Sequence, residues 1–267
     1  MDEGSAGRRV IVERRAAVAL VVLNNPAKRN ALNPDLLIDL IEALGRLRTE
    51  DVRALIFRGA GEKSFCSGYD ISAIPTRIPP KNFAQESHRN LVQEAIGLVE
   101  AFPIPTVAML NGHAWGAGCE LATACDLRVA VPEATFGMPP AKLGVIYSPR
   151  GLKRFLNLVG VANTKEMFFT ARGMSAARAL DMGLVNHVVP REELEDFVTA
   201  LASDIAAGAP LALRGMKRVI GFCLAHDLAP EDEAEATRLI AESFSSEDLV
   251  EGQAAFLEGR RPEFKGR

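Results

Sequence analysis

The residues with the clearest chemical potential lie in a glycine-rich loop, Asn111–Leu121 (NGHAWGAGCEL). The loop follows an apolar run and opens a segment of helical character. Backbone N–H groups in the first turn of a helix lack intrahelical acceptors, so they can stabilise negative charge that develops on a substrate. Glu120 follows Ala117 by three residues, about one turn along the same helix face. The loop could therefore present an amide donor and a carboxylate to one pocket, or it could be a glycine-rich turn with a solvated acid.

A second loop, Lys63–Ile71 (KSFCSGYDI), has a related position in the sequence. It follows the apolar run Ala54–Phe57, and ligands of α/β sheets bind beyond the carboxyl ends of strands. Gly68 permits a close backbone approach, and Asp70 could cap the next helix. One amide from each loop would form an oxyanion hole that polarises a carbonyl and stabilises an enolate. The alternative is an ordinary strand-to-helix turn. No G-x-S-x-G, P-loop or G-x-G-x-x-G pattern points to a competing chemistry.

The elements around these loops alternate between apolar β-rich runs and amphipathic segments. Asn33, Pro34 and Asp35 give an N-cap, a proline at the first helical position and an acid in the first turn. Strands that alternate with helices predict an α/β layer structure with buried sheets. Strands are expected at residues 18–23, 54–57, 106–110 and 127–131, and helices at 34–48, 83–102 and 121–125.

The pattern changes after about residue 150, where helical segments dominate. They are expected at 151–159, 164–171, 175–182, 192–207, 210–224 and 232–257, with one β stretch at 185–189. No proline- or serine-rich linker interrupts the chain. The sequence therefore predicts an α/β core over residues 1–190 and a helical C-terminal part over 191–267.

Composition excludes several classes of protein. The chain has 267 residues, of which 48% are hydrophobic, which is ample for a folded core. The longest apolar run, Ala16–Leu23, is far shorter than the ~20 residues of a membrane helix, and the N-terminus lacks the apolar region of a secretory signal. A net charge of -3 argues against a general nucleic-acid binder. We expect no membrane and no nucleic-acid partner.

The cysteines and histidines point to no metal site. The four cysteines include no C-x-x-C pair, and the four histidines form no H-E-x-x-H or similar cluster. Cys119 and Cys125 lie in apolar sequence, which is typical of buried free thiols. These features fit a reducing cytoplasm, so we expect a cytoplasmic protein without a metal.

Six segments of the chain, in the order in which they follow one another, resemble the crotonase superfamily, also called enoyl-CoA hydratase/isomerase. The resemblance extends over nearly the whole chain. Its segments are residues 24–33 (NNPAKRNALN), 65–71 (FCSGYDI), 111–126 (NGHAWGAGCELATACD), 136–144 (FGMPPAKLG), 176–189, and 256–264 (FLEGRRPEF).

The resemblance implies a crotonase-type spiral of ββα turns with a helical C-terminal trimerisation region, assembled as a homotrimer or homohexamer. It also implies an acyl-CoA thioester as substrate, with no cofactor beyond the coenzyme A that the substrate carries. The two oxyanion amides fall on Tyr69 and Ala117. The implied substrate and CoA contacts are Lys28, Arg29, Ala31, Ser67, Gly68, Asp70, Ile71, Gly116, Pro140 and Phe256.

One departure from the family pattern concerns the second acid. Typical hydratases use two glutamates to add water to a double bond, since one carboxylate activates the water and the other helps to move the proton. Glu120 matches the first glutamate, but Pro140 occupies the position of the second. Proline transfers no proton, so efficient hydration by two acids is not expected.

Within the superfamily the chain most resembles the methylmalonyl-CoA decarboxylases. The matches include the Trp115–Gly116 pair, Pro140, and Tyr147 in the segment LGVIY. Decarboxylation of a malonyl-type thioester gives the enolate directly, so no base has to remove a proton from carbon. Tyr147 could orient the departing carboxylate by a hydrogen bond. Tyr69 is a difference, because that subfamily can carry histidine there.

Two other functions stay open. The chain could be an enoyl-CoA hydratase or isomerase that uses Glu120 as its single acid and base, or a non-catalytic acyl-CoA or RNA-binding protein on the same fold. Individual residues also have structural alternatives. Tyr147 could pack in the core with its hydroxyl on backbone, Glu120 could pair with a cation, and Lys28 and Arg29 could be solvated charges.

Overall fold

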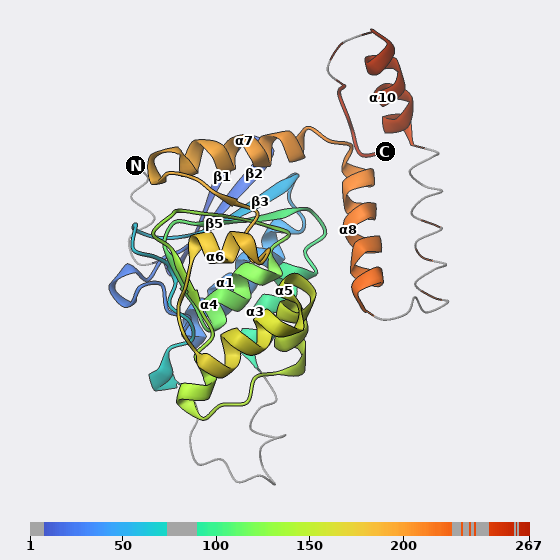
Figure 1. The fold of residues 1–267 in the computed structure, drawn as a ribbon. Helices are drawn as coiled ribbons and strands as arrows, with labels where there is room; N and C mark the ends of the chain where they lie inside the picture. The colour runs from blue at the N-terminus through green and yellow to red at the C-terminus, as the bar shows by residue number, and fades with distance from the viewer. Residues whose placement is uncertain are drawn as a thin grey trace.

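The computed structural model describes residues 8–73, 90–225, 246–258, 260 and 262–267, with positions 231, 235 and 238. The chain forms two β-sheets with helices packed around them (Figure 1). The larger sheet has the order β1 (Val10–Arg15), β2 (Val18–Leu23), β3 (Ala54–Gly59), β5 (Thr106–Leu110), β7 (Leu127–Ala130) and β10 (His187–Val188). The smaller sheet has the order β4 (Ser64–Cys66), β6 (His113–Trp115), β8 (Thr135–Gly137) and β9 (Met174–Ser175).

The strands of the larger sheet are parallel except for β1, which pairs antiparallel with β2. Every residue of β2 and of β5 is buried, as expected for strands covered on both faces. Helix α1 (Pro34–Leu47) buries six apolar residues, and the Asn33 side chain accepts a hydrogen bond from the Leu36 amide at 2.8 Å. The predicted strands at 18–23, 54–57, 106–110 and 127–131 and the helix at 34–48 are thus confirmed.

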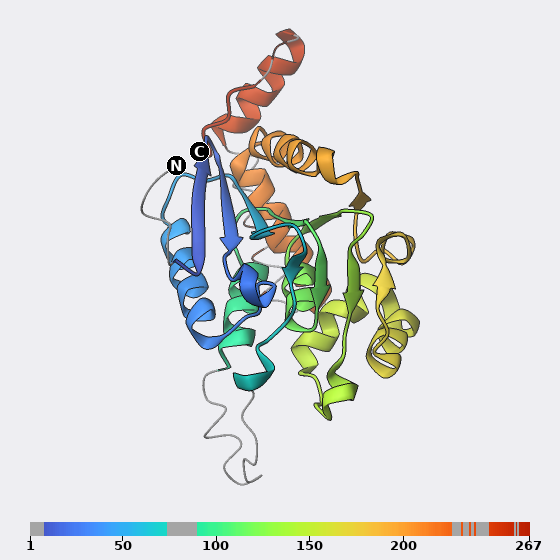
Figure 2. The same ribbon diagram turned by 90° about the vertical axis from the view of Figure 1, so that its left-hand side faces the viewer.

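The two sheets are built by a repeated path of the chain (Figure 2). A strand of the larger sheet leads into a strand of the smaller sheet and then into a helix, as in β5, β6 and α4 (Ala117–Ala124). β7, β8 and α5 (Pro149–Thr170) repeat the order, with the short 3-10 helix η4 (Pro140–Leu143) before α5. These successive ββα turns confirm the predicted α/β architecture.

Several details differ from the sequence prediction. None of the strands of the smaller sheet was expected, because runs of two or three residues show no readable period. β1 was not expected either, because the second half of its six residues is charged (Glu13, Arg14 and Arg15). The two helices expected at 151–159 and 164–171 are the two parts of α5, which meet at a kink at Gly160, where the backbone is not helical and φ is 73°. Helix α3 spans Leu91–Glu100 and ends two residues before the expected end at 102, whereas residues 83–89 of the expected helix lie outside the described residues.

The C-terminal helices differ in how they meet the core. α6 (Ala176–Asp181) and α7 (Leu194–Ala206) pack on the body, and α7 lies across β3 and β5. α8 (Pro210–Ala225) and α10 (Glu247–Glu258) extend to one side in Figure 1. Lys217 ties α8 to the core by ammonium contacts of 2.6 Å with Asp126 and 3.0 Å with the Ile104 carbonyl. The division into residues 1–190 and 191–267, and trimer formation, remain predictions.

In the described part of the chain, no single helix is long and apolar enough to cross a bilayer. Residues 191–206 and 210–224 reach that threshold only together, as a pair bent by 102°.

Candidate active site

The two loops singled out in the sequence lie side by side, because β4 and β6 are parallel neighbours in the smaller sheet. Their following residues therefore emerge at the same sheet edge. Gly68 has a φ of 105°, a conformation that side chains disfavour. A Cβ at this position would lie 2.8 Å from the Trp115 carbonyl oxygen and 3.6 Å from the Ala117 amide nitrogen. The contact requires glycine and brings the backbones of both loops together.

The two expected oxyanion donors, the Tyr69 and Ala117 amides, have no acceptor among the residues that the structure describes. The Leu32 amide donates to the Gly68 carbonyl and the Asp70 amide donates to the Leu32 carbonyl, each at 2.8 Å. In this parallel bridge the N–H of Tyr69 points away from Leu32, and it meets no acceptor among the described residues. Ala117 is the first residue of α4, so its N–H has no intrahelical acceptor. Oxyanion holes are built from two such unpaired amides.

The expected CoA-contact residues lie on two adjoining segments. The Ser67 amide donates to the Arg29 carbonyl at 3.0 Å, and the Ser67 hydroxyl donates to the Lys28 carbonyl at 3.1 Å. Lys28 Nζ donates to Asp70 Oδ2 at 2.8 Å, which closes the two segments together. Ala31 is buried beside them and Ile71 is exposed. The side chain of Phe256, on α10, lies outside what the structure describes.

Asp70 serves both as an ion-pair partner and as a cap. Its Oδ1 accepts hydrogen bonds from the Ser72 amide at 3.0 Å and the Ser72 hydroxyl at 2.6 Å, at the start of the 3-10 helix Ile71–Ala73. The predicted capping role is thus confirmed. The hydrogen bond from Lys28, followed by those from Ser72, lowers the pKa of Asp70 to about 2. The carboxylate is therefore ionised at neutral pH and holds Lys28 beside the oxyanion loops.

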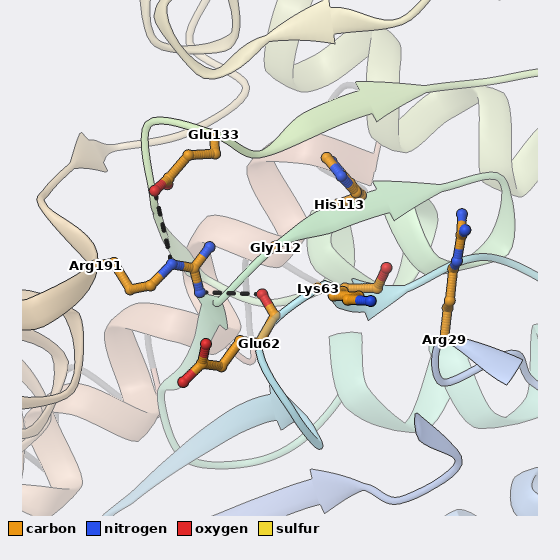
Figure 3. A pocket seen from close by; sticks show the side chains of 8 residues that line it. Arg29, Glu62, Lys63, Gly112, His113, Glu133 and Arg191 are labelled. Carbon is orange, nitrogen blue, oxygen red and sulfur yellow. Dashed lines mark hydrogen bonds and ion pairs between the residues drawn. The ribbon is translucent and has the colours of Figure 1, made fainter. Parts of the chain in front are cut away.

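A pocket of about 370 Å³ lies at the amino ends of β4 and β6, opposite the oxyanion edge (Figure 3). Arg191 is occupied there by the Glu62 and Asn111 carbonyls, each at 3.0 Å, and by Glu133 at 3.7 Å. Arg29 and Lys63 also line the pocket and form no ion pair with any residue that the structure describes. The pocket thus offers two available cations next to the segment of Lys28.

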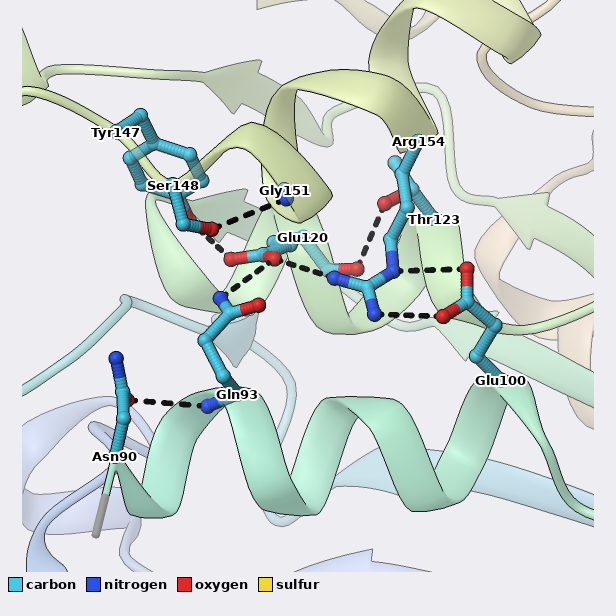
Figure 4. Close-up of polar contacts among 9 residues, drawn as sticks. All are labelled: Asn90, Gln93, Glu100, Glu120, Thr123, Tyr147, Ser148, Gly151 and Arg154. Carbon is cyan, nitrogen blue, oxygen red and sulfur yellow. Dashed lines mark hydrogen bonds and ion pairs between the residues drawn. The ribbon is translucent and has the colours of Figure 1, made fainter. Parts of the chain in front are cut away.

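The Glu120 carboxylate is fully buried, with 0% of its side chain exposed, and both of its oxygens are occupied (Figure 4). Oε1 accepts from Gln93 Nε2 at 2.9 Å and from Arg154 Nη1 at 2.6 Å. Oε2 accepts from the Tyr147 hydroxyl. A buried charge is tolerated when it is paired and hydrogen-bonded in this way. The structural alternative expected from the sequence, a cation paired with Glu120, is therefore present: the cation is Arg154.

Arg154 connects Glu120 to a second carboxylate. Its Nε and Nη2 donate to Glu100 Oε1 and Oε2 at 3.1 and 2.7 Å. The Arg154 side chain is 3% exposed and that of Glu100 is 44% exposed. Gln93, Glu100 and Arg154 were not among the residues expected from the sequence. Gln93 and Glu100 are seven residues apart on α3, and that shared helix face is the signal that was available.

Tyr147 is fixed by packing as well as by Glu120. Its ring meets Phe168 edge-on at a centroid distance of 5.3 Å. A Cβ at Gly151 would lie 2.6 Å from Tyr147 Cε1 and 2.8 Å from Glu120 Oε1, so this position has no room for a side chain. Burial, and then the charge and hydrogen bond of Glu120, raise the pKa of Tyr147 well above its usual value. The hydroxyl keeps its proton and donates it to a carboxylate, rather than to backbone.

Pro140 is buried at the first position of η4. The neighbouring Pro139 adjoins the oxyanion edge, because a Cβ at Gly116 would lie 3.9 Å from Pro139 Cδ. No second carboxylate hydrogen-bonds to Glu120 or Tyr147 in the part of the chain that the structure describes. The described residues also include no group of three or more His, Cys, Asp or Glu side chains that could hold a metal ion.

Comparisons with known proteins agree with one another. Residues 13–267 match the sequence model of the enoyl-CoA hydratase/isomerase family. The chain is 38% identical to a short-chain-enoyl-CoA hydratase of Clostridium acetobutylicum, over 97% of this chain and 98% of that protein. It is 36% identical to methylmalonyl-CoA decarboxylase of Escherichia coli, over 93% of this chain and 95% of that protein. A crystal structure of an enoyl-CoA hydratase from Bacillus anthracis superposes with a TM-score of 0.89 at 32% identity, over 97% of this chain and 100% of that one.

Proposed function

The chain belongs to the enoyl-CoA hydratase/isomerase, or crotonase, family of acyl-CoA enzymes, and we propose that it decarboxylates a short malonyl-type CoA thioester such as methylmalonyl-CoA. The observation that carries this proposal is the state of Glu120, whose two oxygens are both occupied by donors. A carboxylate held in this way is poorly placed to take a proton from water or carbon. Decarboxylation needs no such base, because the bond to carbon dioxide supplies the electrons of the enolate.

The proposed reaction moves charge from one side of the site to the other. The thioester oxygen accepts hydrogen bonds from the Tyr69 and Ala117 amides. The electron pair of the bond to the carboxylate carbon becomes the enolate double bond, and the carbonyl pair moves onto the thioester oxygen. Carbon dioxide leaves, and the enolate carbon takes one proton from solvent. The negative charge of Glu120 repels the substrate carboxylate. It therefore favours movement of the negative charge to the thioester oxygen, which the two amides stabilise.

Tyr147 is assigned the orientation of the substrate carboxylate. Its hydroxyl has one proton, which Glu120 holds in the free protein. We propose that this hydroxyl turns to the substrate carboxylate on binding, while Arg154 and Gln93 continue to hold Glu120. The hydrogen bond would hold the carboxylate out of the plane of the thioester, where its bond to carbon overlaps with the carbonyl π system.

Coenzyme A is assigned to the adjoining segments of Lys28–Ala31 and Ser67–Ile71. Lys28 and Arg29 supply cations for the nucleotide phosphates, and Lys63 adds a third in the pocket that Arg29 also lines. Gly68 and Gly116 let the thioester approach the backbone closely, and Pro140 borders the acyl group. Phe256 is assigned to cover the nucleotide. We propose no metal and no cofactor other than the coenzyme A of the substrate.

A second candidate function is enoyl-CoA hydration or isomerisation with Glu120 as the only acid and base. Glu120 stands one helical turn beyond Ala117, where a general base for a substrate in the oxyanion hole would be placed. The Clostridium relative carries the name of a hydratase. This chemistry would require Tyr147 to release one oxygen of Glu120.

A mass-spectrometric time course with methylmalonyl-CoA and crotonyl-CoA separates the two. Under the proposal, methylmalonyl-CoA loses 44 mass units as carbon dioxide while crotonyl-CoA changes slowly or not at all. Gain of 18 mass units by crotonyl-CoA alone would replace the proposal by the second candidate. The Ala117→Pro variant, which lacks one oxyanion amide, is the control for enzyme-dependent turnover.

A further inference from the structure

The guanidinium of Arg154 lies between two carboxylates that differ in exposure (Figure 4). It gives one N–H to Glu120, which is fully buried, and two to Glu100, which is 44% exposed. The contact with Glu100 is the parallel, two-bond arrangement that fixes both the position and the plane of a guanidinium. The direction of the third N–H, toward Glu120, therefore depends on Glu100.

Glu100 occupies an unfavourable place in its own helix. It is the last residue of α3, where the helix dipole disfavours negative charge. Its contact with Arg154 compensates for that position. Two turns earlier on the same helix, Gln93 donates to Glu120 Oε1 at 2.9 Å. Helix α3 thus provides one hydrogen-bond donor to Glu120, the Gln93 amide. It also provides the carboxylate of Glu100, which orients the second donor, Arg154.

We propose that Glu100 is a positioning residue for the acyl-CoA reaction, because it aims Arg154 at Glu120 and shares the guanidinium charge with it. This inference rests on the proposed function, in which an ionised Glu120 accepts the Tyr147 hydrogen bond in the free protein and repels the substrate carboxylate during the reaction. Glu100 touches no reacting atom in this scheme. It acts through Arg154 on the strength of the negative charge at the centre of the site.

Among the charged and titratable groups around Glu120, Arg154 is the one through which Glu100 acts on Glu120. Tyr147 faces Glu120 from the segment before α5, and Cys119 adjoins it on α4. Both stay neutral at ordinary pH, since burial raises the pKa of Cys119 to about 12 and that of Tyr147 well above its usual value. Arg150, also on α5, lies near Gly97 of α3. Among the described residues, Arg154 is the cation in contact with Glu120.

Two substitutions are expected to act in opposite directions on the pH profile of kcat/KM. Glu100→Gln removes one of two negative charges that share Arg154, while the amide oxygen of glutamine keeps one hydrogen bond from the guanidinium, so ionised Glu120 becomes more stable. The acid limb should move to lower pH by about half to one unit, given the partial screening of an exposed charge. Arg154→Lys keeps a cation but loses the planar fork. We expect its acid limb to move to higher pH and its kcat to fall at least about tenfold.

Glu166→Gln is the matched control, because Glu166 also pairs with an arginine, Arg178, at 3.3 Å on an exposed part of α5. It should leave the acid limb where it is. A purely structural role for Glu100 predicts a lower melting temperature for Glu100→Gln with the acid limb unchanged. That result would overturn the inference.

A stability measurement tests the same contacts without turnover. The free energy of unfolding is measured between about pH 4 and pH 8 for the wild type, Glu100→Gln, Glu120→Gln and the double variant. We expect the effect of Glu100→Gln on the pH dependence to disappear in the Glu120→Gln background. The same effect in both backgrounds would overturn the inference. Loss of the proposed function is recognised separately, by wild-type protein that releases no carbon dioxide while this coupling persists.

Discussion

The hydroxyl of Tyr147 donates its proton to the buried carboxylate of Glu120, so the two groups that the sequence offered for catalysis are bound to each other. A hydroxyl has one proton to donate. Glu120 cannot hold that proton while the hydroxyl orients a second carboxylate, and it cannot present Oε2 to water while Tyr147 stays in place. Under the proposed function, the reaction therefore depends on whether the Tyr147 hydroxyl donates to Glu120 or to the substrate when a thioester is bound.

The first prediction concerns Tyr147→Phe. Without the hydroxyl, a malonyl carboxylate loses its orienting donor, and Glu120 gains a free oxygen. We expect decarboxylation of methylmalonyl-CoA to fall at least about tenfold, while any hydration of crotonyl-CoA stays constant or rises. Initial rates with each thioester measure both effects.

Tyr69→Phe is the control for this substitution, because Tyr69 is the other tyrosine of the chain and is assigned to act through its amide. Among the residues that the structure describes, its hydroxyl contacts the Ala73 carbonyl alone, at 3.5 Å. We expect near wild-type rates. A large loss in Tyr69→Phe would mean that the side chain takes part, and an unchanged rate in Tyr147→Phe would remove its assigned role.

The second prediction removes an oxyanion donor and leaves the helix intact. Proline is tolerated at the first position of a helix, which Ala117 occupies in α4, and it lacks an N–H. Ala117→Pro should therefore lower kcat by about 10²- to 10³-fold while the melting temperature changes little. Ala117→Ser retains the amide and should stay close to the wild type. Equal rates in the two variants would place the second donor elsewhere.

Sequence patterns predicted the larger sheet well because its signals are local. β2, β3, β5 and β7 are short apolar runs bounded by turn residues, and α1 begins with Asn33 and Pro34. The smaller sheet escaped prediction because its strands have two or three residues and lie in glycine-containing sequence. Such strands form because the ββα path brings them together, which no local pattern encodes.

The same contrast between local and distant signals holds for the site. The neighbouring positions of the two loops could be predicted because glycines that follow an apolar strand mark the edge of an α/β sheet where ligands bind. The contacts of Glu120 could not, because Gln93, Tyr147 and Arg154 come from segments that lie 27 or more positions from it. An arginine within an amphipathic helix normally belongs to the solvent face. Only the packing of α5 against α4 buries Arg154.

The third prediction concerns the space beside Tyr147. A methyl group at position 151 would overlap both the Tyr147 ring and Glu120 Oε1. Gly151→Ala should therefore lower the free energy of unfolding by about 1–3 kcal/mol and displace Tyr147, with loss of decarboxylation. Gly45→Ala on α1 is the matched control, since a Cβ there meets no atom within 4 Å. Alanine at that helical position should stabilise by up to about 1 kcal/mol. Chemical denaturation of the two variants checks both signs.

The last prediction uses the ion pair that joins the two CoA-contact segments. The hydrogen bond from Lys28 lowers the pKa of Asp70 to about 2, from an ordinary value of 3.8. A carboxyl group whose pKa is lower in the folded protein stabilises the fold above its ordinary pKa, and this contribution is lost as the pH falls toward the folded value. The stability difference between wild type and Asp70→Asn should therefore be constant above about pH 5 and shrink between about pH 4 and pH 2. Urea unfolding over this pH range measures this difference. A difference between wild type and Asp70→Asn that persists unchanged to pH 2 would show that the carboxylate of Asp70 does not hold the two segments together.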